Sequence, residues 1–522
     1  MTLPALAQPQ DSLFVRAHAN GQQAREGFRR CIRFVNGWLA EADPASSLIP
    51  RNLKEGRDIW NPQDAAADNY PFMVLTAAVL RPDLFRGRML EMLRTEQKLT
   101  SRVGRVPDIY SFSRKTFSQP LDTSQLIFGA AEYMKDGLVP LTEWLGKSPW
   151  SDRMLGILDD LSRLVDVPTR IEGDFYGNSP VVEVNGDLLQ VLSRMYWMTG
   201  DKKYLAWATR IGDYFFSDAQ LPTRSLSRLR LRDHGCEIVA GLTELYLMAH
   251  FASPAKKKQW QPYLYEMLDC ILEKGRNEHG LFYDEINPVT GEVVVAHLAD
   301  TWGYTLNTYY TVFLLDGVTR YREAVLKSLA SLDTHYHNHD WEGNSDGYAD
   351  AIESALNLYF REPLPSVKSW LDSQIQVMWS FQQPSGVIEG WHGDGNFART
   401  TLMYCLWKTA GLTTSDWNDR LVYGTVVDGQ KLYLSLTDEK ADWRGNLKFG
   451  YRKHRETLHL PIDYPRINQF QEWYPVQTER TYTLTNAATG RTETIKGKKL
   501  IEGYPVAVRK GETLRLVLTP KQ

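Results

Sequence analysis

Two kinds of helical segment alternate along most of the chain, and this alternation constrains the fold more than any other feature. From about residue 20 to about residue 415, apolar residues recur with a helical period. Stretches with one charged face, such as residues 201–216, are followed by stretches that are apolar or small on nearly every face, such as residues 234–249. A helix that is apolar all round is buried, so each pair predicts one exposed helix and one inner helix.

The inner stretches begin seven times, at intervals of 46 to 66 residues. Their expected starts lie near residues 64, 123, 184, 234, 300, 346 and 393. A closed ring of inner helices, wrapped by the exposed ones, buries all of them economically and brings their polar starts to one mouth. An open solenoid uses the same alternation, but its repeats usually keep a fixed length. We therefore predict a mainly α chain with an (α/α)6-7 toroid over residues 20–418.

The pattern of apolar and polar residues changes after residue 418. Short stretches alternate between apolar and polar residues, as antiparallel strands do, and Thr457–Tyr464 is one of them. Turn residues that favour hairpins separate such stretches at Asp428-Gly429, Gly490 and Lys510-Gly511. We predict that residues 419–522 form an antiparallel β-sandwich domain, to which we assign no chemistry.

Composition argues against several classes of protein. The formal net charge is -3 and the pI is near 6.4, whereas a non-specific nucleic-acid-binding protein needs a basic surface. No apolar run approaches the roughly 20 residues of a membrane span. The four cysteines lie far apart and lack the spacing of a zinc site.

The first residues are similar to the end of an export signal. Ala5-Leu6-Ala7 precedes Gln8, as small residues precede a cleavage site. We expect residues 1–19 to be a tail and the protein to be periplasmic or secreted; an ordinary disordered terminus is the alternative.

Acidic residues four positions apart mark four of the inner-helix starts. The pairs are Asp64 with Asp68, Glu183 with Asp187, Asp233 with Glu237, and Asp346 with Asp350. Residues four apart share one face of a helix, so in a toroid these pairs converge on one cavity. Capping of the helix and complementing its dipole is the alternative role for any single pair.

The stretch from Asp233 to Glu237 is the first choice for the chemical step. Asp233, His234 and Glu237 stand within about one helical turn and can divide the roles of acid, base and orienting group. Asp346 is the second choice. Crowded carboxylates raise one another's pKa, which suits a general acid at neutral pH. A hydrogen-bonded core histidine is the alternative for His234.

Polar and aromatic residues at the other starts are expected to bind the substrate. They are Trp60, Asn61, Asp64, Arg232, Asp300, Trp302, Tyr304, Asp350, Glu389, Trp391, His392, Asp394 and Arg399. Aromatic rings stack on ligands, sugars included, although core packing is the alternative for each Trp. Arg232 and Arg399 suit bidentate binding of a substrate carboxylate, which favours a uronic acid. Pairing with neighbouring aspartates is the alternative role for both.

We expect neither a metal nor a cofactor. Glu342, Asn344, Asp346, Gly347 and Glu353 follow the spacing of a calcium loop, but a helix that begins near Asp346 would break it. The sequence contains no glycine-rich phosphate loop, nucleophile-elbow serine or zinc-type histidine pair.

One helix pair resembles a known superfamily. In residues 196–216, YWMTGDKKYLAWATRIGDYFF, a Tyr-x-x-x-Gly turn is followed by Tyr-x-x-x-Ala and an aromatic end. This pattern resembles helix pairs of the six-hairpin glycosidase superfamily, (α/α) toroid enzymes that act on carbohydrates. The resemblance covers the architecture of residues 20–415 and carries over no catalytic residue. A toroid followed by a β-sandwich is also similar to the toroid polysaccharide lyases.

Together these features predict a glycoside hydrolase that acts on a polysaccharide or oligosaccharide by carboxylate acid/base catalysis. A pocket closed on one side favours action from a chain end, and the arginines favour a uronic-acid-containing, β-glucuronidase-like substrate. One alternative is a polysaccharide lyase, in which His234 or Tyr304 abstracts a proton while Arg232 neutralises the uronate. A second alternative is a non-catalytic glycan-binding protein, and a weaker one is a sugar epimerase or isomerase. The sequence does not specify the oligomeric state.

Overall fold

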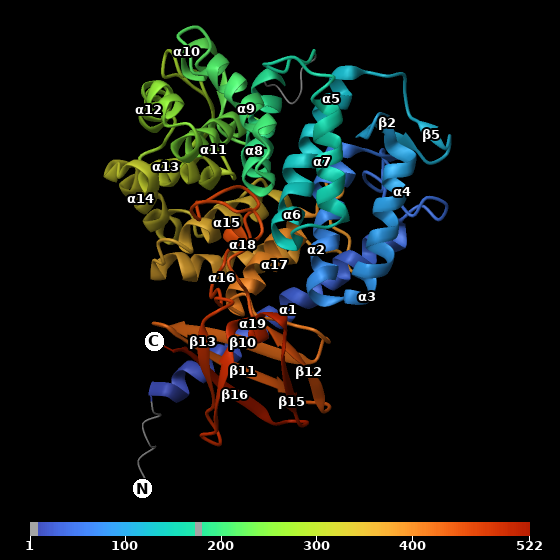
Figure 1. Cartoon of the computed structure of the whole chain (residues 1–522), viewed down its shortest axis with the longest axis vertical. Helices are drawn as coiled ribbons and strands as arrows, with labels where there is room; N and C mark the ends of the chain where they lie inside the picture. The colour runs from blue at the N-terminus through green and yellow to red at the C-terminus, as the bar shows by residue number, and fades with distance from the viewer. Residues whose placement is uncertain (1–8, 173–179, 522) are drawn as a thin grey trace.

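The computed structural model describes residues 9–172 and 180–521, and within them an inner ring of helices closes on itself (Figure 1). Each inner segment packs against the next, and the last packs against the first. The segments are η1 (Pro62–Asn69) with α2 (Tyr70–Leu80), α5 (Thr123–Glu132) with η3 (Tyr133–Leu138) and α6 (Val139–Leu145), α8 (Pro180–Thr199), α11 (Cys236–Ala252), α13 (Trp302–Asp316), α15 (Ser345–Tyr359) and α17 (Asn396–Lys408). Every segment begins within four residues of a start predicted from the sequence.

An outer layer of helices wraps this ring. Its members are α1 (Pro9–Glu41), α4 (Leu90–Thr100), α7 (Pro149–Leu161), α9 (Lys202–Phe215), α12 (Pro254–Lys274), α14 (Thr319–His335) and α16 (Pro365–Ser380). The layers differ as predicted, because α11 buries every residue from Cys236 to Ala249, whereas α9 buries one stripe that includes Tyr204, Ile211 and Phe215. The two layers form the predicted (α/α) toroid, with seven inner segments.

Short elements connect the layers. The helical ones are α3 (Pro82–Leu84), η2 (Phe85–Met89) and α10 (Pro222–Ser225). The strands are β1 (Ile59–Trp60), β2 (Ser101–Val103), β3 (Val106–Pro107), β4 (Tyr110–Ser111), β5 (Thr116–Phe117), β6 (Leu229–Arg230), β7 (Tyr283–Ile286) and β8 (Val293–Leu298). None of the helices in the described part of the chain is long and apolar enough to cross a membrane.

Gly186 brings α8 and α11 unusually close together. A Cβ at this position would lie 2.4 Å from the carbonyl carbon of Glu237, a distance that real side chains do not adopt. Because Gly186 has no side chain, the start of α11 can lie directly against α8, and the predicted catalytic stretch lies next to this contact.

The residues after α17 form two antiparallel sheets, drawn in orange and red in the lower part of Figure 1. One has the order β10-β11-β16-β13-β14 and the other the order β15-β12-β9. The strands are β9 (Thr413–Thr414), β10 (Leu421–Asp428), β11 (Lys431–Asp438), β12 (Trp443–Lys448), β13 (Thr481–Asn486), β14 (Thr492–Lys496), β15 (Tyr504–Val508) and β16 (Thr513–Pro520), with helix α19 (Gly497–Glu502) after β14.

Two of the three predicted hairpins form. β10 pairs with β11 across Asp428-Gly429, and β13 pairs with β14 across the turn at Gly490. The prediction of a hairpin at Lys510-Gly511 was wrong. The strand before this turn, β15, pairs with β12, and the strand after it, β16, pairs with β11 and β13. That turn carries the chain from one sheet to the other.

Helix α1 lies on the five-stranded sheet. Residues 9–19 belong to this helix, whereas the sequence suggested a tail. Ala5-Leu6-Ala7 lies outside the described residues. Gly21 meets β10 so closely that a Cβ on Gly424 would lie 2.1 Å from the Gly21 nitrogen. Helix α1 packs on β10 and β11 of this sheet, where a second sheet would pack in a β-sandwich. The β-sandwich therefore stays a prediction.

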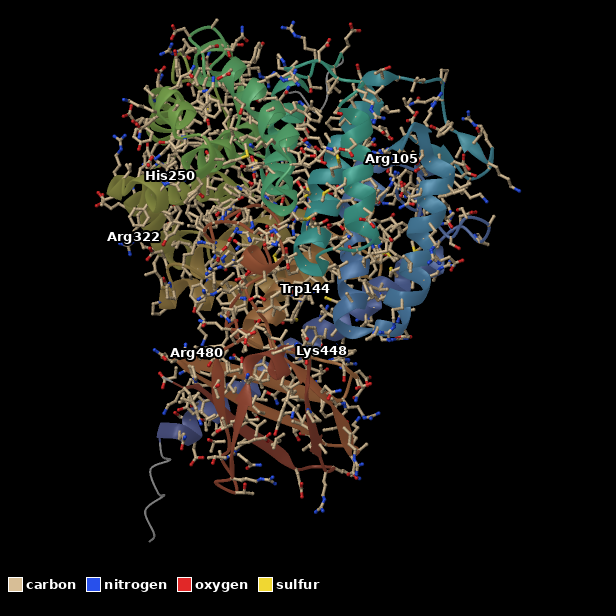
Figure 2. All side chains as sticks on the ribbon, in the orientation of Figure 1. Arg105, Trp144, His250, Arg322, Lys448 and Arg480 are labelled. Carbon is tan, nitrogen blue, oxygen red and sulfur yellow. The ribbon has the colours of Figure 1, made fainter. Side chains whose placement is uncertain are left out.

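The segment between β12 and β13 leaves the sheets and enters the ring. Its helix α18 (Lys453–Glu456) is the red turn among the ring helices in Figure 1. Thr457–Tyr464, predicted as a strand, is irregular. Trp144 of α6, labelled in Figure 2, packs edge-on against Phe470 with ring centroids 5.5 Å apart. Thr457–Tyr464 forms hydrogen bonds with side chains of the ring and not with a neighbouring strand. The alternating pattern of this stretch therefore did not predict its structure correctly.

Candidate active site

A polar cavity of about 250 Å³ opens among the starts of the inner helices. Most of the residues predicted for the site line it, which agrees with the expected convergence. They are Asp64, Arg232, Asp233, His234, Glu237, Tyr304, Asp346, Asp350, Trp391, His392 and Arg399.

Two predicted aromatic residues lie in the core instead. Trp60 is 2% exposed and packs edge-on against Tyr133, and Trp302 is 0% exposed. Neither can stack on a sugar, which corrects the prediction. The ring interior needs large apolar side chains to fill it, and tryptophan at a helix start supplies them.

Four other predicted residues support the cavity without lining it. They are Asn61, Asp300, Glu389 and Asp394. Asn61 accepts a hydrogen bond from the backbone nitrogen of Ala65 at 3.0 Å, and Asp394 accepts one from Asn396 at 3.0 Å. Glu389 accepts one from the backbone nitrogen of Leu53 at 2.8 Å. These carboxylate and amide groups cap helices and hold loops, which is the alternative role that the sequence left open.

Three carboxyl groups meet on one side of the cavity. Asp233, Asp300 and Asp350 place oxygen atoms within 4.8 Å of one another. Asp233 and Asp350 line the cavity, whereas Asp300 is 2% exposed. The Nε atom of Arg232 lies 3.4 Å from an oxygen of Asp233 and 3.4 Å from an oxygen of Asp300. Arg232 is therefore shared between acidic side chains, and the crowding disfavours ionisation of all of them at once.

The surroundings of Asp233 and Asp350 shift their pKa values in opposite directions. Burial raises the pKa of Asp233, but the charges of Arg232 and His234 outweigh it and hold the pKa below its ordinary value. Burial raises the pKa of Asp350 well above its ordinary value in spite of Arg399. Asp350 therefore keeps its proton to a higher pH than its neighbour Asp233 does.

The contacts of Tyr304 agree with a protonated Asp350. The phenol oxygen lies 2.9 Å from Asp350 Oδ1 and 2.7 Å from Glu353 Oε2. Arg399 pairs with both acids, at 2.6 Å and 2.9 Å. A phenol has one proton and donates to one acid at a time, so both contacts can be hydrogen bonds when one of the acids is protonated. The raised pKa of Asp350 favours the neutral form of that acid.

The start of α15 is a capped helix and not a calcium loop. Asn344 accepts a hydrogen bond from the backbone nitrogen of Gly347 at 2.9 Å, and the helix is continuous from Ser345. Glu353 is fully buried and pairs with Arg399, as expected for a residue deeper in the ring.

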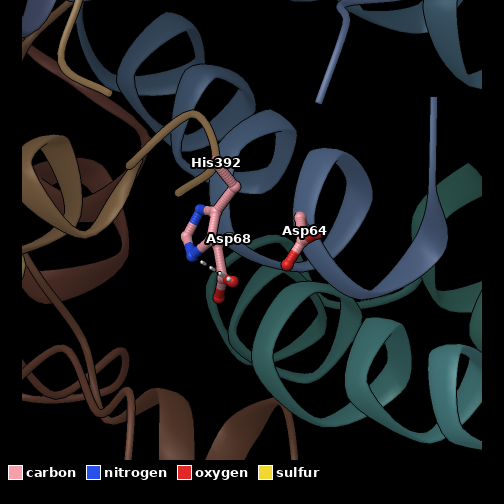
Figure 3. Close-up of side chains that lie close together, drawn as sticks. All are labelled: Asp64, Asp68 and His392. Carbon is pink, nitrogen blue, oxygen red and sulfur yellow. Dashed lines mark ion pairs between the residues drawn. The ribbon is translucent and has the colours of Figure 1, made fainter. Parts of the chain in front are cut away.

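Both histidines that line the cavity are held as cations. His234 has a φ of +64 and forms a short ion pair with Glu183. Burial alone would lower the pKa of His234, but Glu183 raises it to about 9. Figure 3 shows the same relation at His392, whose Nε2 lies 3.7 Å from Asp68 Oδ2. Burial opposes the charge here too, but Asp64 and Asp68 raise the pKa of His392 to about 9.

Glu237 has less freedom than the sequence suggested. It is 3% exposed, its Oε1 accepts from Lys135 at 2.7 Å, and its Oε2 accepts from Gln190 at 2.6 Å. With both oxygens bonded, Glu237 is better suited to holding Lys135 than to transferring a proton.

The arginines are also engaged. Arg232 forms a short ion pair with Glu342 besides its contacts with Asp233 and Asp300. Arg399 binds Asp350 and Glu353. The alternative of pairing with neighbouring acids therefore holds for both.

Trp391 differs from the buried tryptophans, because it is 62% exposed and lines the cavity. The guanidinium carbon of Arg51 lies 4.5 Å from its ring centroid. A fixed, exposed indole at the mouth of a polar cavity is a platform on which a sugar ring can stack.

Several residues that line the cavity were not predicted from the sequence. Lys135 and Asp136 belong to η3, where a charged pair in an otherwise apolar stretch was the available signal. Ile467 comes from the segment that enters the ring and lies far from the other lining residues in the chain. No local pattern could have found it.

Comparison with known proteins gives only distant similarities. No protein-family model and no curated protein matches the sequence. Among solved structures, the GH76A alpha-1,6-mannanase from Salegentibacter sp. HEL1_6 is 14% identical with a TM-score of 0.41, covering 60% of this chain and 95% of its own. The cellobiose 2-epimerase from Bacillus thermoamylovorans B4167 is 11% identical with a TM-score of 0.40, covering 53% and 87%. A possible member of the GH105 family from Salmonella enterica is 12% identical with a TM-score of 0.37, covering 55% and 85%. Similarity at this level assigns neither a substrate nor a catalytic residue to this chain.

Proposed function

We propose that this protein is a glycoside hydrolase that uses Asp350 as general acid and Asp233 as its carboxylate partner. Glycoside hydrolysis needs one carboxylic acid to protonate the leaving oxygen and one carboxylate to attack the sugar or activate water. The observation that carries the proposal is the pair itself, which lines one cavity within 4.8 Å and has opposite pKa shifts. Such pairs assign acid and base roles in known hydrolases.

The short separation favours a mechanism that retains the anomeric configuration. Carboxyl groups about 5 Å apart act on the sugar directly, whereas inverting enzymes keep them about 6.5–9.5 Å apart to admit a water molecule. Asp233 would attack the anomeric carbon while Asp350 protonates the leaving oxygen. Asp350 would then take a proton from the water that releases the sugar from Asp233.

Elimination and epimerisation have weaker support. The two bases considered for removing a proton from carbon are a neutral His234 and the phenolate of Tyr304. His234 is held as a cation because Glu183 raises its pKa to about 9 against the effect of burial. Burial raises the pKa of Tyr304 well above its ordinary value, which disfavours the phenolate.

Action from a chain end is part of the proposal. It is supported by Ile467, which lines the cavity and packs with Cys236, Ala240 and Tyr304, so that apolar side chains form part of the cavity wall. A uronic-acid substrate has less support, because Arg232 already binds Glu342 and Arg399 already binds Glu353. Export to the periplasm or beyond the cell stays a proposal that rests on the sequence alone.

Product analysis tests the proposed reaction. The purified protein is incubated with plant, algal and bacterial glycans while reducing ends and ultraviolet absorbance by unsaturated products are followed. We expect new reducing ends without absorbance, and a monosaccharide as the product. Rising absorbance would replace the hydrolase by a lyase. Glycan binding without turnover, retained when Asp233 and Asp350 are both changed to Asn, would identify a binding protein.

A further inference from the structure

The chain from Asp463 to Gln469, which follows β12 of the C-terminal sheets, is anchored inside the ring by buried polar contacts. Arg466 is 0% exposed and forms an ion pair with Glu143 of α6. The Nδ2 atom of Asn357 in α15 donates to the carbonyl oxygen of Arg466 at 2.8 Å. Buried charges and carbonyls of this kind are costly unless partnered, so the segment is held in one position by two inner segments of the ring.

Asn468 in this segment bridges two residues that line the cavity. Its Nδ2 donates to Asp136 Oδ1 at 3.0 Å, and its Oδ1 accepts from Arg399 Nη1 at 3.1 Å. Its backbone nitrogen donates to Glu353 Oε1 at 2.6 Å. The φ of Asn468 is +60, a left-handed conformation that asparagine tolerates better than most residues. The local backbone therefore suits asparagine, and its amide spans from η3 to α17.

Asp136 is oriented by two donors. Lys135 Nζ lies 2.9 Å from Asp136 Oδ1 and donates to Asp136 Oδ2 at 3.0 Å, and Asn468 donates to Oδ1. The Asp136 side chain is 15% exposed and lines the cavity. A carboxylate has about four acceptor positions, so these donors leave acceptor capacity for a ligand in the cavity.

We propose that Asn468 is a positioning residue that holds Asp136 as the acceptor for one hydroxyl group of a sugar bound in the cavity. The inference rests on the proposed function, since it takes the ligand to be a sugar. The partner of Asp136 is then a hydroxyl of a sugar in the cavity that Asp136 and Ile467 both line. The C-terminal segment thus contributes to substrate selection and not only to stability.

Substrates that lack single hydroxyl groups test this role. The glycoside that the wild-type protein hydrolyses is compared with its monodeoxy analogues. We expect one deoxy position to lower kcat/KM by roughly 10- to 100-fold, because a hydrogen bond to a charged group is lost. Asn468→Gly keeps the backbone conformation and its N–H, and Asn468→Asp keeps the side-chain shape but replaces the donor by an acceptor. In both variants the penalty at that position should shrink by about tenfold.

Asn357→Ala is the matched control. It removes the buried bond to the Arg466 carbonyl but no group that lines the cavity. It should lower the thermal stability and leave the deoxy penalty as in the wild type. An unchanged penalty in Asn468→Gly and Asn468→Asp overturns the positioning role.

A failure of the proposed function gives a different result. If no glycoside is hydrolysed, the same comparison is made by calorimetric titration with D-mannose, D-glucose, D-galactose and their monodeoxy forms. A hydroxyl preference that disappears in Asn468→Gly supports the positioning role in a protein that binds sugars without hydrolysing them. Absence of binding to all of these sugars overturns both proposals.

Discussion

The carboxyl groups of Asp233 and Asp350 lie within 4.8 Å of each other, yet their pKa values move apart. Burial favours the neutral form of both, and only Asp233 has enough neighbouring positive charge to overcome it. Two chemically identical side chains thereby acquire different protonation states in one cavity. This difference is the basis of the acid and base roles proposed for them.

Replacing either carboxyl group by an amide should stop turnover without unfolding the protein. Asp233→Asn and Asp350→Asn keep the side-chain shape but can neither attack the sugar nor transfer the proton, so we expect kcat to fall by roughly 10²- to 10⁴-fold. Asp213→Asn on the outer helix α9 is the control, because it removes a carboxylate that does not line the cavity and that binds Lys256 at 2.7 Å and Trp260 Nε1 at 3.0 Å. Near-normal kcat in both site variants would reject the assigned pair.

The dependence of kcat/KM on pH should be bell-shaped. Activity requires ionised Asp233, whose pKa lies below the ordinary value, and protonated Asp350, whose pKa lies well above it. Activity should therefore fall in acid as Asp233 gains a proton and fall at higher pH as Asp350 loses one.

An aryl glycoside with a good leaving group distinguishes the fall in activity at low pH from the fall at higher pH. The aryl group leaves with little help from an acid, so only the fall at higher pH should depend on the substrate. With this substrate Asp350→Asn should remain active and lose the fall at higher pH. Persistence of that fall would assign the acid to another group.

The sequence predicted the ring well because the signal for it is local. An inner helix must be apolar on all faces, and this requirement shows in each stretch separately, as in Cys236–Ala249. The acidic starts were also visible, and their convergence followed from closing the ring. The sequence could not separate Trp391 from Trp302, because exposure is decided by the packing of distant helices. It could not locate Asn468 either, since its partners Asp136 and Arg399 are 332 and 69 residues away along the chain.

The ion pair between His234 and Glu183 should make stability depend on pH. The pKa of His234 in the folded protein is about 9, above the ordinary value of 6.5, because Glu183 outweighs burial. Its stabilisation is fully present below pH 6.5 and is lost as pH rises through about 9, and it amounts to at most about 3 kcal/mol. Urea unfolding at pH 6 and pH 9.5 measures the change. In His234→Gln this part of the slope should disappear, and an equal slope in both proteins would contradict the assignment.

The ion pair between Arg466 and Glu143 should couple the unfolding of the ring to that of the C-terminal sheets. Both side chains are buried, at 0% and 6% exposure, and they join the segment after β12 to α6. Arg466→Met would leave the Glu143 carboxylate buried without its cation, which costs roughly 3–5 kcal/mol. Changing Glu143 to Gln in the same protein should recover part of this loss, because the uncompensated charge is then gone. Urea unfolding measures the free energies, and differential scanning calorimetry should show one transition for the wild-type protein. Two separate transitions in the wild type, or a single variant as stable as the wild type, would show that the inserted segment does not join the two parts energetically.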